Sequence, residues 1–192
     1  YRVWYSQAYS SLDSWKGPFT PLASYFTHWG LLLFVVVSWM SWETREWLAS
    51  TPLSALKKLK PYQLLIEGAL IFLVLVLLGS MMISPMAMLL GLQYKGTSVG
   101  WIALPIAAWA GILLLNPSLP DSKRLVLFLI GTALFITIIV EIFVVRGDIG
   151  RANTIFKFYL QAWLMLAVSG GAALAWTLPA FFQWLPGWRA IW

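Results

Sequence analysis

The sequence contains no cysteine, a single histidine and few charged residues. The lack of cysteine excludes a disulfide, a thiolate nucleophile and a cysteine metal site, and leaves the redox compartment undetermined. One histidine excludes a conventional zinc site made of protein ligands alone. The sequence also lacks a Ser-His-Asp set, a Walker loop, a dinucleotide fingerprint and a paired-carboxylate motif. The catalytic motifs that are easiest to identify in a sequence are therefore absent.

Charged residues make up only 10% of the 192 residues, and hydrophobic residues make up 60%. A soluble domain is about one quarter charged, and the mean hydropathy of this chain is +0.79. The apolar residues occur in runs of roughly twenty, the length that crosses a hydrocarbon core of ~30 Å. These runs lack the period-two alternation of barrel strands, so they must be helices. We predict an all-α fold, a polytopic transmembrane helical bundle that forms one domain over residues 1–192.

The apolar runs predict about five spans, with interfacial helices beside them. The expected spans are 21–42, 62–79, 98–115, 125–145 and 153–178. Residues 1–20 are expected to form an external loop, and 43–60 and 179–192 to lie at the headgroups. Thr20 is expected to cap the first span, with Pro21 at its first helical position. We expect Pro105 to kink its helix and Pro179 to end the last one; the apolar segment 80–96 is left unassigned.

The formal charge of +6 comes from 13 Lys and Arg against 7 Asp and Glu. In a membrane protein this excess indicates topology and contact with anionic lipid rather than nucleic acid. Arg45, Lys57, Lys58 and Lys60 share one loop, which favours an outside amino terminus and an extracytoplasmic Arg146–Lys157 segment. Because the chain starts at Tyr1 with no signal peptide in view, we expect a fragment or a processed chain.

A polar stripe enters the last expected span. Asn153, Lys157 and Gln161 recur every four residues and therefore share one helix face. Such a stripe must face the protein interior or a wet cavity, and Glu141 and Asp148 are the nearest counter-charges in the sequence. We predict a pocket at the mouth of the last two spans.

Basic side chains would make this pocket positive. Arg146, Arg151 and Lys157 lie close to a helix amino terminus, whose N–H groups favour anions, and phosphate is the obvious ligand. The alternative is that Glu141 or Asp148 simply neutralises Arg151 or Lys157 in a structural ion pair. Residue types alone do not decide between these two interpretations. Elsewhere, His28 is expected to be a packing residue and Glu67 to reach the membrane surface.

The same residues resemble the hallmark of the prokaryotic YYY-type membrane proteins, the family called domain of unknown function 2298. The resemblance consists of Glu141, Asp148 and the string Arg151-x-Asn153-Thr154-x-Phe156-Lys157-x-Tyr159-x-Gln161-x-Trp163. The opening Gly17-Pro18-x-Thr20-Pro21-Leu22, followed by His28-x-Gly30-Leu31-x-Leu33-Phe34, is similar too. The chain departs from the family in having Ala152 where Met is commoner. It would correspond to the carboxy-terminal part of these larger proteins.

The resemblance implies, by analogy, a GT-C-like glycosyltransferase that takes sugar from a polyprenyl-phosphate lipid outside the cytoplasm. Arg151 and Lys157 would hold the lipid phosphate, with Asn153, Tyr159 and Gln161 beside it. Glu141 or Asp148 would orient the cations or bind a divalent cation. The catalytic half is missing, so this chain alone is expected to be inactive.

The alternative is a non-catalytic membrane subunit or scaffold that packs against other membrane subunits or pigments. A transporter is disfavoured, because no second broken helix mirrors the interruption at Ser84-Pro85.

Overall fold

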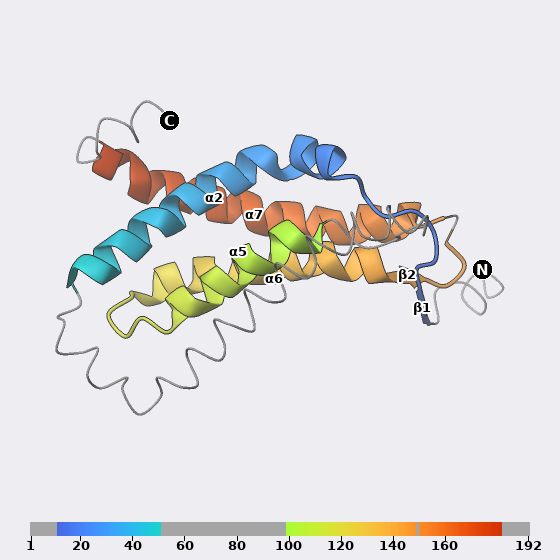
Figure 1. Cartoon of the computed structure of the whole chain (residues 1–192), viewed down its shortest axis with the longest axis horizontal. Helices are drawn as coiled ribbons and strands as arrows, with labels where there is room; N and C mark the ends of the chain where they lie inside the picture. Colours follow the sequence, from blue (N-terminus) through green and yellow to red (C-terminus); the bar gives the residue numbers. More distant parts are fainter. Residues whose placement is uncertain (1–10, 51–98, 149, 182–192) are drawn as a thin grey trace, which may run out of the picture.

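The computed structural model describes residues 11–50, 99–148 and 150–181, which contain four helices. The helices run roughly along the long axis of the molecule (Figure 1). They are α2 (Leu22–Ser50), α5 (Gly100–Leu114), α6 (Asp121–Ile142) and α7 (Ala152–Ala180). The expected span 62–79, the unassigned segment 80–96 and most of the two expected interfacial segments lie outside the described residues.

Three of these helices are long and apolar enough to cross a membrane: α2, α6 and α7. Helix α5 is apolar too, but its 15 residues rise only ~22 Å, which is less than the ~30 Å hydrocarbon core. Pro105 lies inside it. The prediction of a transmembrane helical bundle is confirmed, although about five spans is slightly more than the described residues show.

Packing places α6 between α5 and α7, and α2 against α7 (Figure 1). The buried face of α2 carries Trp29, Leu33, Val36 and Met40, spaced three or four residues apart, so they form one stripe. Trp39 packs on Trp176 of α7, with 5.1 Å between ring centroids. Large aromatic side chains therefore join α2 to α7 in the interior.

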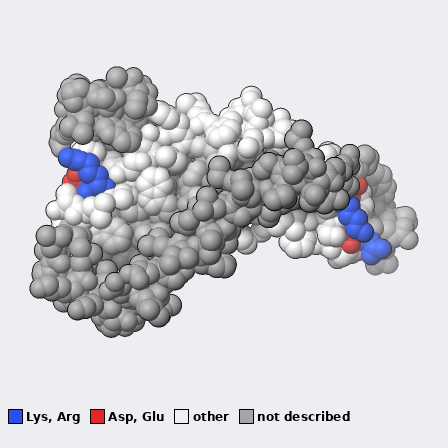
Figure 2. All heavy atoms as spheres, in the orientation of Figure 1, with Lys and Arg blue, Asp and Glu red and all other residues white. Residues whose placement is uncertain are grey.

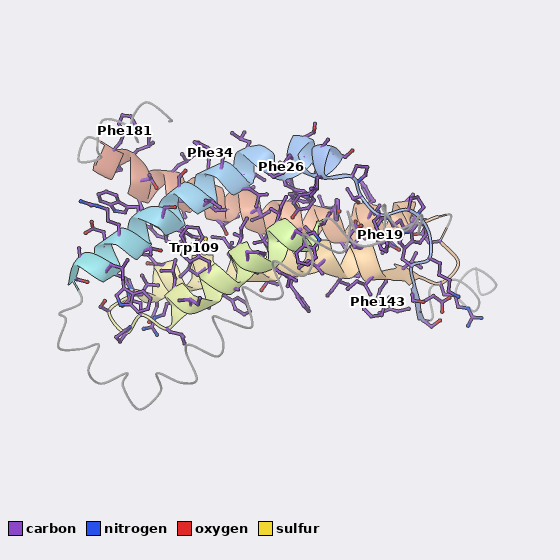
Figure 3. All side chains as sticks on the ribbon, in the orientation of Figure 1. Phe19, Phe26, Phe34, Trp109, Phe143 and Phe181 are labelled. Carbon is purple, nitrogen blue, oxygen red and sulfur yellow. The ribbon has the colours of Figure 1, made fainter. Side chains whose placement is uncertain are left out.

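The outer faces of the helices are apolar as well. Leu104 of α5, Phe128 and Phe135 of α6, and Phe156 of α7 are exposed. So are Phe26 and Phe34 of α2, both labelled in Figure 3. Exposed large apolar side chains on every helix are what a lipid-facing surface requires.

A short two-stranded antiparallel sheet was not expected. Strand β1 (Leu12–Ser14) pairs with β2 (Phe143–Val145), with Leu12 opposite Val145. The sequence analysis placed 143–145 in the fourth span, and this was wrong because α6 ends at Ile142 and Phe143 is extended (φ −119°, ψ 149°). The backbone groups that follow the end of α6 form hydrogen bonds with β1 instead of within a helix.

Two helices continue beyond their expected ends. Helix α2 runs to Ser50, although residues from Glu43 onward were expected at the headgroups. Helix α7 runs through Pro179 to Ala180, although Pro179 was expected to end it. A proline this close to the end of a helix removes only one main-chain hydrogen bond, so the last turn survives.

The contact between α2 and α7 depends on a glycine. A Cβ atom on Gly170 would lie 3.6 Å from Leu32 and 4.0 Å from Val35, whereas one on Gly171 would meet nothing within 4 Å. We expect Gly170→Leu to lower the stability of the protein by about 1 to 3 kcal/mol, because the larger side chain separates the helices. Gly171→Leu is the matched control and should have little effect. Thermal unfolding in detergent measures both; equal losses would contradict this packing.

Candidate functional site

Charged side chains gather at the two ends of the described structure. Figure 2 shows blue and red atoms near both ends and none on the face between them. We call the end with β1, β2 and the start of α7 the strand end, and the end where α2 finishes and α6 begins the loop end (Figure 1). Each end contains one buried ion pair.

The ion pair at the strand end joins Glu141, the penultimate residue of α6, to Arg151, which immediately precedes α7. Arg151 Nη1 donates to Glu141 Oε1 over 2.9 Å. Thr20 donates to the same carboxylate through its backbone N–H (2.9 Å) and its hydroxyl (2.6 Å). The side chain of Glu141 is fully buried and that of Arg151 is 9% exposed. We call Thr20, Glu141 and Arg151 the latch.

Arg151 makes two further hydrogen bonds to protein groups. Nη2 donates to the Thr20 hydroxyl over 2.9 Å, and Nη1 donates to the Val140 carbonyl over 3.1 Å. The guanidinium lies over the Trp15 ring, 5.2 Å from its centroid. The structural ion pair that the sequence left open as an alternative is therefore present between Arg151 and Glu141.

Thr20 has a different role from the one expected. It was predicted to cap the first span, but its hydroxyl and N–H bind Glu141, 121 residues away in the sequence. The start of α2 is stabilised instead by the Pro21 carbonyl, which accepts from the N–H of Tyr25 over 3.0 Å. Thr20 was missed as a site residue because a Thr-Pro pair matches the cap pattern so well.

Asp148 stabilises the start of α7. Its carboxylate accepts hydrogen bonds from the backbone N–H of Asn153 (3.2 Å) and from both the N–H and the hydroxyl of Thr154 (2.8 Å each). Gly147 and Gly150, with φ of 86° and 65°, let the chain turn there. A carboxylate at this position satisfies helix N–H groups and complements the helix dipole.

The polar stripe lies on the outward face of α7. Asn153, Lys157 and Gln161 share one face, as their spacing of four residues predicts. All three are exposed, however, so the expectation that this face points into the protein interior was wrong. Arg151 faces inward to the latch instead. The structure therefore places Arg151 and Lys157, expected to hold one ligand, on different faces.

Tyr159 faces inward as well. Its ring lies 5.1 Å from Trp29 and 5.9 Å from His28, centroid to centroid. The hydroxyl of Tyr159 is buried next to Thr20 of the latch. The indole N–H of the fully buried Trp29 has no hydrogen-bond partner in the described part of the chain. Tyr159 therefore lies between the aromatic residues of α2 and the latch, separate from the exposed stripe.

The ion pair at the loop end was not anticipated. Lys123 of α6 donates to Glu43 of α2, which is only 6% exposed, and Trp39 Nε1 donates to the same carboxylate over 3.0 Å. Lys123 also lies over the Trp176 ring, 5.7 Å from its centroid. The signal available in the sequence was the spacing of four between Trp39 and Glu43, which puts both on one helix face.

The two ion pairs lie about one membrane thickness apart. Lys123 and Glu141 are 18 residues apart (141 − 123) on α6, and at ~1.5 Å per residue they are separated by ~27 Å along the helix. A hydrocarbon core is ~30 Å thick. We therefore take the two pairs as markers of the two membrane surfaces.

The carboxylates near the stripe are occupied by protein donors. Glu141 binds Arg151 and Thr20, and Asp148 binds the start of α7. Within 11–50, 99–148 and 150–181, no three acidic or histidine side chains gather in a group that could hold a metal ion. Both carboxylates therefore serve protein donors of the latch and of the start of α7.

A family model described as an uncharacterized membrane protein, DUF2298, matches residues 1–166. This range includes the latch, Asp148 and the whole polar stripe. The comparison with curated proteins found no match, and neither did the comparison with solved structures.

We expect Arg151→Met to lower the free energy of unfolding by about 3 to 5 kcal/mol, because Glu141 would keep a buried charge without its cation. Arg146→Met is the control: Arg146 and Asp13 form an exposed pair at 4.0 Å, worth at most about 1 kcal/mol. Denaturation in mixed micelles measures both variants. A small effect at Arg151, equal to that at Arg146, would show that the latch does not hold the helix ends together.

We expect Asp148→Ala to cost about 0.5 to 2 kcal/mol, because the first N–H groups of α7 lose their acceptor. Asp13→Ala removes an equivalent charge from an exposed position at the same end and should be nearly neutral. Hydrogen exchange at the amides of Asn153 and Thr154 reports the loss locally. Unchanged exchange at both amides in Asp148→Ala would refute this role.

Proposed function

The chain belongs to the DUF2298 family of uncharacterized membrane proteins, and from this premise we propose that its helices bind the phosphate group of a lipid on the outward face of α7. The observation that carries the proposal is the position of Lys157. This side chain is exposed on a helix long and apolar enough to span a membrane. Its ammonium group therefore lies where lipid headgroups can reach it.

Lys157 lies deeper along α7 than the latch, and a charge inside a membrane is costly. It is six residues beyond Arg151 (157 − 151), and thus ~9 Å further along α7 than the latch. Placing a lysine at the centre of a bilayer costs about 2.5 to 3.5 kcal/mol, and a lysine near a helix end extends its ammonium to the surface. Lipid phosphates are the abundant anions of a membrane surface, and they accept charge-assisted hydrogen bonds from ammonium groups.

The other stripe residues support a phosphate ligand. Asn153 and Gln161 lie one turn before and one turn after Lys157 on the same exposed face, and their side-chain amides are hydrogen-bond donors. Phe156 and Trp163 are exposed near them, at 71% and 48%. Aromatic side chains are typical of the membrane interface, where headgroups lie. The stripe thus combines one cation, two amides and two aromatic rings.

The analogy between this family and GT-C glycosyltransferases suggests the lipid, and we propose a polyprenyl phosphate that carries a sugar. In this proposal the chain is the carboxy-terminal membrane part of a larger protein, and the strand end faces the extracytoplasmic side. It contributes lipid binding, while the catalytic carboxylate lies elsewhere. The competing function is a non-catalytic membrane subunit whose outward face of α7 contacts another protein.

Native mass spectrometry of the purified protein tests the proposal. We expect a polyprenyl-phosphate lipid to co-purify with the wild type and added polyprenyl phosphate to bind. Affinity should fall by about tenfold or more in Lys157→Gln, because a hydrogen bond to a charged group is lost. Lys157→Arg should retain binding. Lys16→Gln removes the same charge from an exposed position before α2 and is the matched control.

Equal binding in Lys157→Gln and Lys16→Gln would contradict the proposal. So would a stoichiometric protein partner that is lost in Lys157→Gln while no phosphate lipid is retained by the wild type. That second result would favour the non-catalytic subunit.

A further inference from the structure

The segment 11–20 is attached to the bundle mainly by polar contacts. We call it the strap. All three residues of β1 are exposed, with Leu12 at 60%, and most of the strap that follows is exposed or half-buried. Its pairing with β2 involves only three residues on each strand, and an isolated pair of short strands is marginally stable in water. Apolar burial therefore contributes little to its position.

The contacts of the strap converge on the end of α6 and the start of α7. Thr20 binds Glu141 and Arg151, as described above. The N–H of Trp15 donates to the Ile142 carbonyl over 2.7 Å, and the N–H of Arg146 donates to the Ser11 carbonyl over 2.9 Å. Glu141 is buried, but these contacts lie at the ends of the helices, outside the apolar core cluster. Loss of the strap would therefore leave the contacts between α2, α6 and α7 in place.

The ring of Trp15 covers the guanidinium of Arg151. Its indole N–H donates to the Pro18 carbonyl over 2.9 Å, so the ring folds back over Gly17 and lies against the Arg151 guanidinium. A Cβ atom on Gly17 would overlap this ring. Glycine at position 17 is thus required for the indole to cover Arg151.

We propose that the strap opens as one unit, with the Glu141 carboxylate as the group that holds it shut, and that opening uncovers Arg151. In the closed state Trp15 and Thr20 cover the guanidinium. In the open state Arg151 faces the aqueous boundary while Glu141 still lies beside it. Local opening of this kind is expected where a segment has few buried apolar contacts and exposed main-chain hydrogen bonds. The proposal does not depend on lipid binding by Lys157.

Hydrogen exchange in detergent micelles tests whether the strap is one unit. The amides of Trp15, Thr20 and Arg146 should exchange at a common rate, faster than the amides in the middle of α6. Thr20→Val removes the hydroxyl and keeps the shape of the side chain, so it should raise all three rates by about tenfold. Thr20→Ser, which keeps the hydroxyl, should leave them close to wild type. Three unrelated rates, or equal acceleration inside α6, would overturn the proposal.

The absence of cysteine allows a second test that does not depend on folding of a weakened variant. Asp13 and Val144 are cross-strand partners, and antiparallel partners have Cα separations of about 4.5 to 5.5 Å, within the range of a disulfide. In Asp13→Cys/Val144→Cys, oxidation should lock the strap, and reduction should release it. The probe is phenylglyoxal, a reagent for arginine, with mass spectrometry of the peptide that contains Arg151.

We expect phenylglyoxal to modify Arg151 at least several-fold more slowly in the oxidised than in the reduced form, while exposed Arg45 reacts equally in both. Gly17→Ala, which displaces the Trp15 indole, should react faster at Arg151 than the wild type. If Arg151 reacts at the same rate with the strap locked and released, the strap does not cover it and the proposal fails.

Discussion

The structure depends on one constraint: the hydrocarbon core of a membrane offers no hydrogen-bond partner. Several hydroxyl groups within the spans therefore bond to their own helix. Those of Ser38, Ser41 and Thr177 donate to the carbonyl four residues earlier. Among the described residues, charged side chains lie near the ends, and each end has an ion pair with a buried carboxylate. The part of this face that Figure 2 draws in white between the two ends has no charged atoms.

Helix α6 organises the bundle because it contributes to both ion pairs. Lys123 at its start binds Glu43 of α2, and Glu141 at its end binds Arg151 before α7. Buried pairs add little net stability compared with apolar residues, because desolvation offsets their attraction. What they contribute is specificity, because a buried charge is stable only beside its counter-charge. The pairs thus fix how far α6 is displaced along its axis relative to α2 and α7.

Composition and periodicity sufficed to predict the membrane bundle and the shared helix face of Asn153, Lys157 and Gln161, because both follow from local spacing. The outward direction of that face was not predicted, because it depends on how α7 packs against α2 and α6. The proximity of Glu141 and Arg151 followed from the short connection between their helices. Strand β2 was not predictable, since an apolar run of Phe and Val suits a lipid-facing helix as well as a strand. The pair of Glu43 and Lys123 joins residues 80 apart, so it depends on tertiary packing that local spacing does not encode.

The central claim is that the two ion pairs mark the membrane surfaces and that α7 crosses between them. Spin labels on single cysteines at Leu160, Asp13 and Arg45 in vesicles test it most directly, by comparing collisions with oxygen and with a polar nickel chelate. Leu160 lies about nine residues past the latch and is 46% exposed. We expect a spin label there to collide often with oxygen and rarely with the nickel chelate. Spin labels at Asp13 and Arg45 should collide often with the nickel chelate. Nickel access at Leu160 equal to that at the two ends would contradict the account.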